Sequence, residues 1–183
     1  MNLCLVPAMN VRLISPDTDV LMLALHYVAT HPTSNVNFEL LNPKGRRLVS
    51  VNHICDYYGA DLTTAILGLY VFTGCDQLSA FNSITKDRVY KQLRNLKQDG
   101  NSSIITALSS LGENKVPSIE LKLSLEKLTV MLYSSKRKDL TTRYSELVGI
   151  LRWELHRKFA EDSCAFPQTP AALRQHMSSG LII

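Results

Sequence analysis

Two short acidic segments carry three aspartates, and each segment adjoins an apolar run. The first is SPDTD at residues 15–19, and the second is TGCD at residues 73–76. Asp17 and Asp19 follow a predicted strand, at the edge where open α/β sheets place their ligands. Mg²⁺ and Mn²⁺ prefer oxygen ligands of this kind. Asp17, Asp19 and Asp76 are therefore candidate ligands of a shared divalent metal site.

The same aspartates also have a purely structural interpretation. Asp17 stands directly before a predicted helix, where a carboxylate oxygen can accept a hydrogen bond from a backbone N–H of the first turn. Asp76 can cap a following turn in the same way. Like charges held close together destabilise each other unless a cation or a proton joins them. Spacing alone leaves both interpretations open, helix caps and a metal site.

The length and composition are typical of one globular domain with a helical tail. The chain has 183 residues, of which 45% are hydrophobic, and its formal net charge is +4. A chain of this size forms one ordinary core but not two comfortable domains. The small basic surplus does not by itself indicate nucleic-acid binding.

The cysteines and the start of the chain indicate an intracellular protein, in the nucleus or the cytoplasm. Cys4, Cys55, Cys75 and Cys164 are scattered singly without C-x-x-C spacing, which favours buried reduced thiols over disulfides or a zinc site. The apolar start, residues 1–7, has no positively charged n-region and is too short to span a bilayer. Membrane insertion and export are therefore not expected.

Hydrophobic periodicity and turn residues predict an α/β class with a strongly helical C-terminal half. A strand over residues 11–15 leads through Pro16 into a buried helix that ends near Pro32. Residues 35–41 and 46–51 flank the turn sequence NPKG and predict a β-hairpin. The remaining predicted elements are helices, over residues 51–58, 62–72, 86–96, 102–111, 118–133, 141–158 and 170–177.

A basic, turn-like stretch follows the second acidic segment and leads into a predicted helix. In it, Lys86, Arg88 and Lys91 are candidate contacts to a nucleic-acid phosphate backbone, with a solvated helix face as the alternative. Basic residues also crowd the predicted hairpin tip at 44–47, where we favour ordinary solvated charges. Trp153 shares the 141–158 helix with apolar residues at helical spacing, which predicts core packing rather than base stacking.

Several enzyme classes can be set aside from the motifs. The sequence contains no glycine-rich phosphate loop, no G-x-S-x-G elbow and no H-E-x-x-H pair. Its five histidines form no metal-ligand spacing. These observations argue against a kinase, a serine hydrolase and a zinc peptidase.

The two acidic segments resemble motifs of a known nuclease family. ISPDTDV at residues 14–20 and FTGCD at residues 72–76 are similar to the acidic motifs in the internal region of flap-endonuclease-like nucleases, members of the PIN-like superfamily. The similarity is closer to a group of mostly uncharacterised, often transposon-associated animal proteins. These carry a similar SPDTDV, and their LLGLHAFTGCD segment followed by SAF resembles residues 66–76 and 79–81 here. The likeness covers most of the chain from about Val11.

The resemblance implies a partial PIN-like, three-layer fold with a small, mainly parallel sheet, a β-hairpin insertion and a predominantly helical C-terminal half. Residues 1–100 would form a truncated nuclease core, and residues 101–183 a helical extension packed on it. Asp17, Asp19 and Asp76 would be the catalytic residues and would hold Mg²⁺ or Mn²⁺, which activates water for phosphodiester cleavage. The implied partner is nucleic acid, DNA rather than RNA.

Two departures from the family pattern weigh against an active enzyme. Residues 1–10 contain no Asp or Glu, although family members have further carboxylates before the SPDTD strand. After Asp76, the sequence NSITK at 82–86 lacks the glycine that lets a backbone approach phosphate closely. We therefore expect a degenerate or inactive fragment of a nuclease. The alternative is a non-catalytic module whose helical C-terminal half binds a partner protein and whose acidic residues serve only as helix caps.

Overall fold

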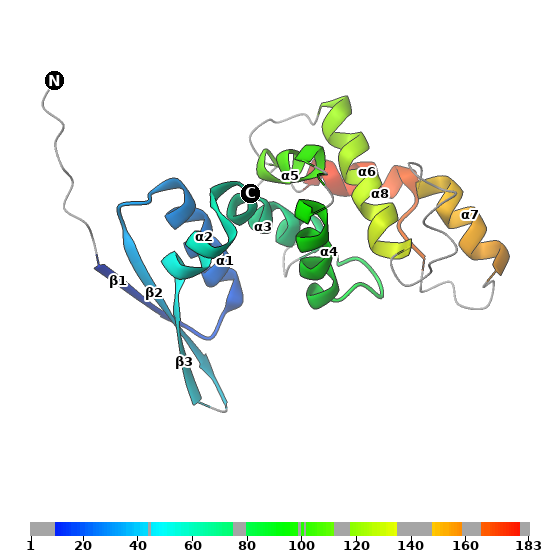
Figure 1. The fold of residues 1–183 in the computed structure, drawn as a ribbon. Helices are drawn as coiled ribbons and strands as arrows, with labels where there is room; N and C mark the ends of the chain where they lie inside the picture. The colour runs from blue at the N-terminus through cyan, green and yellow to red at the C-terminus, as the bar shows by residue number, and fades with distance from the viewer. Residues whose placement is uncertain are drawn as a thin grey trace, which may run out of the picture. The chain divides into compact units, whose positions relative to one another are not determined.

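The structure is a computed structural model that describes residues 10–43, 45–74, 80–98, 100, 102–111, 118–134, 148–158 and 166–179. In this part of the chain it is α/β, with eight helices and one small mixed sheet of three strands (Figure 1). The predicted class is confirmed. The chain divides into two compact units, Met1–Leu67 and Gly68–Ile183. Helix α3 (Ala60–Phe72) runs across the division.

The first unit contains the sheet, whose strand order is β1 (Asn10–Ser15), β2 (Asn35–Asn42), β3 (Gly45–Ser50). Helix α1 (Thr18–Thr30) connects β1 to β2, and these two strands pair in parallel. Strand β2 pairs antiparallel with β3. The predicted hairpin is confirmed. The sheet is mixed rather than mainly parallel, because a tight turn between β2 and β3 permits only antiparallel pairing.

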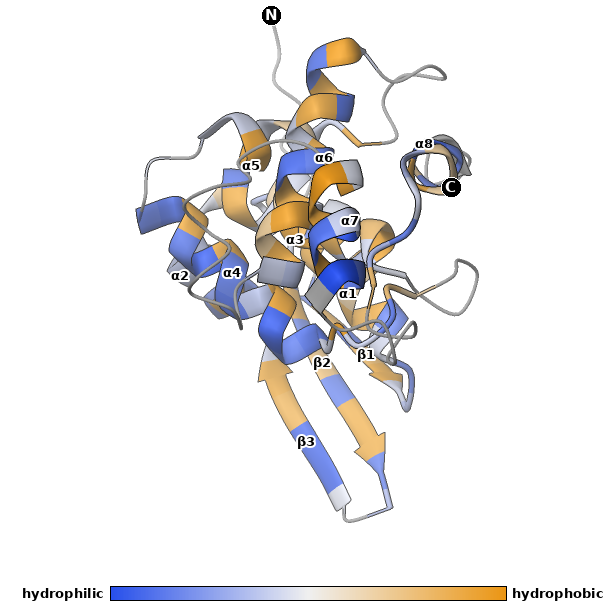
Figure 2. Cartoon of the chain, turned by 90° about the vertical axis from the view of Figure 1, so that its right-hand side faces the viewer, coloured by the Kyte–Doolittle hydropathy of each residue, from blue (hydrophilic) through white to orange (hydrophobic). Residues whose placement is uncertain are grey.

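One face of this sheet packs against α1 and α2 (Val51–Tyr58). Side chains alternate along β2, so that Val36 and Phe38 face the helices. Ala24, Leu25 and Val28 of α1 complete the core with Val51 and Cys55 of α2. Figure 2 shows the alternation of apolar and polar segments along β2 and β3.

Cys55 and α1 test two further expectations. Cys55 is a buried free thiol, and desolvation by this burial raises its pKa above the usual value, as expected for an inert thiol. The other three cysteines lie outside the described residues.

Helix α1 is buried on one side only, since Leu23 and Tyr27 are 58% and 43% exposed. The prediction of a wholly buried helix was therefore wrong for that side.

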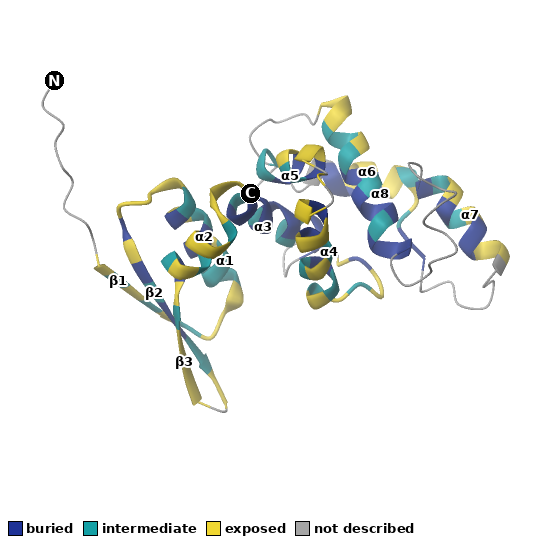
Figure 3. Ribbon diagram, in the orientation of Figure 1, coloured by how far each residue is buried: buried dark blue, intermediate teal, exposed yellow. Residues whose placement is uncertain are grey.

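The second unit is helical in its described residues. Helix α6 (Ile119–Ser134) packs against α4 (Lys86–Gln98), α5 (Ser102–Ser109), α7 (Val148–Lys158) and α8 (Pro170–Ser179). Its C-terminal half is buried almost throughout, as Figure 3 shows. All the predicted helices are confirmed, although residues 141–147 of the predicted 141–158 helix lie outside the described part.

Gly68 of α3 allows an unusually close approach to α5. A Cβ atom at this position would overlap the backbone carbonyl oxygen of Leu108. Since that atom belongs to the backbone, it cannot move aside as a flexible side chain would. Gly68 therefore determines how closely α3 and α5 pack.

Trp153 lies on the surface of α7, not in the core as predicted. Its side chain is 61% exposed, and the guanidinium group of Arg157 lies 5.2 Å from the ring centroid. The buried side of α7 is formed by Val148, Leu151 and Leu155 at helical spacing. Trp153, two residues from Leu151, lies on the opposite side of the helix.

Among the described helices, none is long and apolar enough to cross a membrane.

Candidate metal and nucleic-acid site

The SPDTD segment forms the turn between β1 and α1. The backbone N–H of Asp17 donates to Ser15 Oγ at 3.0 Å, and the N–H of Asp19 donates to Asp17 Oδ1 at 2.8 Å. Asp17 has extended backbone dihedrals and is the N-cap of α1. Ser15 thus stabilises the turn, and Asp17 is a helix cap, which was the structural interpretation of this residue.

The two carboxylates of this segment lie at the carboxyl end of β1 and the amino end of α1. Asp17 is exposed and Asp19 is partly buried in the first turn of the helix. The partial positive charge at a helix amino terminus stabilises negative groups there. Local helix electrostatics therefore accounts for both aspartates without a metal ion.

The donor set nevertheless fits a hard divalent ion in kind. Capping engages Oδ1 of Asp17 with the Asp19 amide, and a carboxylate has a second oxygen and further lone pairs with which to accept. Asp76 lies outside the described residues. Within the described residues, no group of three or more His, Cys, Asp or Glu side chains is placed to hold a metal ion.

Residues 70–74, at the C-terminus of α3, are held by an extensive set of hydrogen bonds. The ammonium group of Lys86 donates to the carbonyl oxygen of Tyr70 at 2.9 Å, to Thr73 Oγ1 at 3.1 Å and to the carbonyl oxygen of Gly74. It also lies 4.1 Å from the centroid of the Tyr70 ring. A cation here is favoured by the partial negative charge of the helix C-terminus.

The remaining carbonyl groups of this helix end also have partners. His176 Nε2 bonds to the carbonyl oxygen of Phe72 at 2.6 Å, and since a carbonyl only accepts, this nitrogen carries the proton. The N–H of Phe81 donates to the carbonyl of Thr73 at 3.2 Å, and the N–H of Gly74 to that of Val71 at 3.1 Å. The helix end that precedes Cys75 and Asp76 is thereby fixed from α4 and α8 together.

These contacts change the interpretation of Lys86. An ammonium group has three N–H donors, and the three hydrogen bonds to the end of α3 use all of them. A phosphate contact by Lys86 would have to replace one of these bonds. Its nucleic-acid contact stays a prediction, and its observed contacts are those of a residue that positions the helix end.

Arg88 and Lys91 differ in their surroundings. Lys91 is exposed and pairs with Asp87 one turn earlier, Nζ to Oδ2 at 2.7 Å. Arg88 is partly buried on α4. Burial raises the pKa of the Tyr133 hydroxyl to about 12, and the positive charge of Arg88 opposes part of this rise. Lys91 is thus the more accessible of the two for a phosphate group.

The loop that lacks glycine adopts a glycine-like backbone at one residue. Ser83 has a φ of 61°, in the left-handed region that non-glycine residues rarely occupy. Tyr133 donates its hydroxyl to the carbonyl oxygen of the preceding residue, Asn82, at 3.0 Å. This bond from α6 fixes the loop and helps to hold Ser83 in its strained conformation.

Sequence reasoning missed the positioning roles of Lys86, His176 and Tyr133. All three act through hydrogen bonds between residues far apart in the sequence, which periodicity does not show. Comparison with models of known protein families, with curated proteins and with solved structures gave no match to this chain.

Proposed function

We propose that this chain is a PIN-like domain related to flap endonucleases, whose ancestral reaction is divalent-metal-dependent hydrolysis of a nucleic-acid phosphodiester. In this proposal Asp17, Asp19 and Asp76 hold Mg²⁺ or Mn²⁺, and the domain retains ion binding more than cleavage. The ion would supply an activated water and stabilise the leaving oxygen.

The observation that carries the proposal is the position of SPDTD. Asp17 and Asp19 follow a strand that pairs in parallel with its neighbour, at the carboxyl end of the strand and the amino end of the next helix. Ligand sites of α/β sheets lie at this edge. Ser15 supports the turn from its Oγ, as a residue behind a metal ligand would do.

The second motif supports the proposal because hydrogen bonds hold its first residues in place. Lys86 and His176 hold the backbone up to Gly74, two residues before Asp76. Metal ligands need this kind of support, because errors of a fraction of an ångström weaken coordination. Low activity is expected since Lys86 is engaged within the chain and Ser83 stands where a glycine would let the backbone approach phosphate.

Titration calorimetry with Mg²⁺ and with Mn²⁺ tests the metal site. We expect weak binding that falls at least about tenfold in Asp17→Asn and in Asp76→Asn, because each removes a charged ligand. Asn is as good an N-cap as Asp, so Asp17→Asn removes the charge without removing the cap. Asp56→Asn, at an exposed aspartate of α2, is the matched control and should leave the affinity unchanged.

The second candidate function is a non-catalytic protein-interaction module. It is favoured by one observation, the hydrogen bond from the Asp19 amide to Asp17 Oδ1, which gives Asp17 a complete structural role. This candidate predicts that Asp17→Asn changes neither metal binding nor stability, while Asp17→Ala lowers stability by about 1 kcal/mol. Unchanged metal affinity in both aspartate variants would favour it over the nuclease-related function.

A further inference from the structure

The face of the three-stranded sheet that does not contact α1 and α2 has an ordered arrangement of charged and apolar side chains. Strand register places Ile14, Glu39 and Leu48 in one row across β1, β2 and β3. Arg12 lies beside Asn37 in the row before, and Arg46 lies beside Leu41 in the row after. Two arginines thus occupy opposite corners around a central glutamate. We call these five residues, Arg12, Ile14, Glu39, Arg46 and Leu48, the open sheet face.

Glu39 is buried even though it belongs to this open side. Its side chain is only 4% exposed, and its two oxygens face the two arginines. Arg12 donates from Nε at 3.0 Å and from Nη2 at 2.6 Å to Oε2, and Arg46 donates from Nη1 at 3.5 Å to Oε1. The carboxylate therefore fixes the two guanidinium groups in place, as a support beneath a binding group does.

Among the described residues, the bonds of both guanidinium groups to Glu39 leave further N–H donors on each group. A guanidinium has five N–H donors, of which the bonds to Glu39 use two on Arg12 and one on Arg46. The two side chains are 62% and 72% exposed. After the charge of Glu39 is offset, one positive charge remains, held in a defined geometry.

Ile14 and Leu48 add apolar area on either side of Glu39. They are 56% and 62% exposed, although solvent-facing positions of a one-sided sheet are ordinarily polar. Figure 3 shows exposed residues along β1 and over most of β3, while the buried residues of the sheet lie on β2 between them. Arginines next to exposed aliphatic side chains are the composition of protein interfaces, which favour Arg over Lys.

We propose that the open sheet face binds an acidic segment of a partner protein. Carboxylates of the partner pair with the outward N–H groups of Arg12 and Arg46, and its apolar side chains pack on Ile14 and Leu48. Charge complementarity decides the sign of the partner, because the one carboxylate of this face, Glu39, is already neutralised. The proposal is independent of the metal site, and it places protein binding on the sheet rather than on the helical C-terminal half.

A nucleic acid is the less suitable occupant of this face. Sheets that bind single strands use aromatic side chains on which bases stack, and the five residues of the open sheet face include none. One net charge also supplies little of the counterion release from which phosphate binding gains its affinity. The aliphatic side chains of Ile14 and Leu48 would find no apolar group to pack against on a phosphate backbone.

Fluorescence anisotropy with the full chain tests the proposal. The probe is a short synthetic peptide in which glutamate alternates with valine, and the matched peptide has lysine in place of glutamate. We expect weak, salt-sensitive binding of the glutamate peptide and none of the lysine peptide. Arg46→Gln should weaken it at least about fivefold, as for an interfacial arginine.

The control for Arg46→Gln is a variant of the next residue in the hairpin, Arg47. Arg47 is also exposed, but strand alternation directs it to the other face of the sheet, so Arg47→Gln should leave peptide affinity within about twofold. Arg12→Gln leaves Glu39 with one weak partner and can unfold the sheet. The double variant Arg12→Gln/Glu39→Gln removes both charges together and keeps the test usable. Leu48→Ser tests the apolar contact and should also weaken binding.

Three results would overturn the proposal. One is equal loss in Arg46→Gln and Arg47→Gln, which would indicate general charge attraction. The second is binding of a single-stranded oligonucleotide more tightly than the glutamate peptide, with the same dependence on Arg46. The third is concentration-dependent dimerisation that Leu48→Ser abolishes while peptide affinity is unchanged, because a second copy would then be the occupant. None of these results would alter the metal titrations, so the two proposals fail separately.

Discussion

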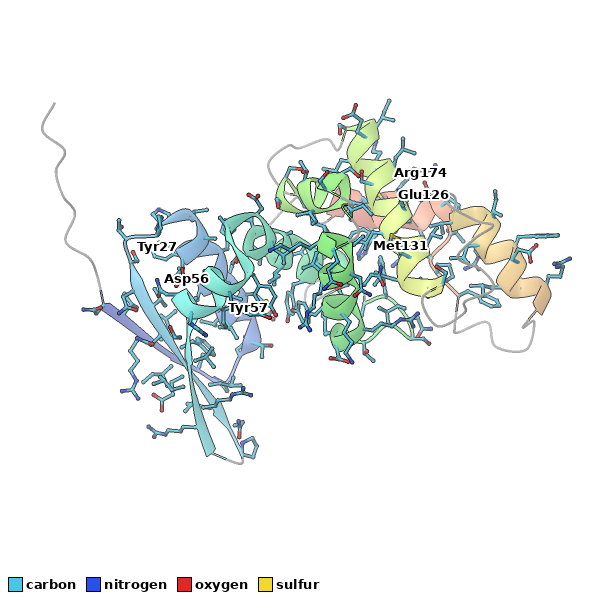
Figure 4. All side chains as sticks on the ribbon, in the orientation of Figure 1. Tyr27, Asp56, Tyr57, Glu126, Met131 and Arg174 are labelled. Atoms are coloured by element: carbon cyan, nitrogen blue, oxygen red, sulfur yellow. The ribbon has the colours of Figure 1, made fainter. Side chains whose placement is uncertain are left out.

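His176 Nε2 donates a hydrogen bond to the carbonyl oxygen of Phe72 at 2.6 Å, joining residues 104 positions apart. The imidazole is 7% exposed and packs at 5.3 Å from the Phe81 ring. A buried polar pair of this kind is costly to break, since the carbonyl would be left without a partner. Figure 4 shows the side chains on the ribbon and labels Glu126 and Met131 of α6 and Arg174 of α8.

We therefore predict that His176→Ala destabilises the protein by about 2–4 kcal/mol, from the lost hydrogen bond and the cavity together. His53→Ala on α2 is the control, because His53 is exposed. Urea unfolding of both variants provides the measurement. Equal midpoints for His176→Ala and the unmodified chain would show that the bond to Phe72 contributes nothing.

Lys86→Met should destabilise the chain by about 1–3 kcal/mol, because the carbonyls of Tyr70 in α3 and of Gly74 just after it lose a charged donor. Lys91→Met, on the same helix, removes the same charge from an exposed ion pair and should cost about 0.5 kcal/mol or less. Thermal denaturation compares the two. A larger loss in Lys91→Met would contradict the positioning role of Lys86.

Gly68→Ala and Gly149→Ala should change the stability of the protein in opposite directions. At Gly68 a methyl group would overlap the Leu108 carbonyl oxygen, and we expect a loss of about 3 kcal/mol or more. At Gly149 the nearest atom would be Pro170 Cγ at 3.5 Å, an ordinary contact, so the better helix propensity of alanine should stabilise by about 0.5–1 kcal/mol. Chemical denaturation of both variants measures the signs. A stable Gly68→Ala variant would mean that α3 and α5 do not pack this closely.

Stability should decline between pH 10 and pH 12. Burial raises the pKa of Tyr133 to about 12, and that of Tyr90 likewise, from the ordinary value of 10.0. The unfolded chain therefore loses these protons first as the pH rises, and ionisation favours unfolding within this window. Tyrosinate absorbance during an alkaline titration should show two late-titrating groups. Tyr133→Phe should remove one of them.

Local patterns predicted the elements well, because each has a signal within a few residues. Gly59 ends α2 with a φ of 81°, and the pairing of Asn42 with Gly45 closes the hairpin. The side on which Trp153 lies was not predictable, because Ile150 and Leu151 both fit an apolar stripe and only tertiary packing selects Leu151. The positions of helix ends were correct to within one or two residues for most helices.

The candidate site was predictable only in its parts. The capping role of Asp17 follows from its place before a helix and was one of the two sequence interpretations. The hydrogen bonds from Lys86 to Thr73 and Gly74 and from His176 to Phe72 depend on long-range contacts, for which the sequence contains no periodic signal. The Glu39 arrangement was also missed, because it needs the strand register that pairs Ile14 with Glu39 and Glu39 with Leu48.

The central claim is that Asp17, Asp19 and Asp76 share one metal ion, and paramagnetic broadening by Mn²⁺ tests it most directly. In amide NMR spectra, substoichiometric Mn²⁺ should broaden the resonances of Asp19 and Asp76 together, and Asp17→Asn should abolish the broadening at both. Magnesium should compete for the same effect. Broadening confined to one of the two segments, or broadening at Asp76 that persists in Asp17→Asn, would contradict a shared site.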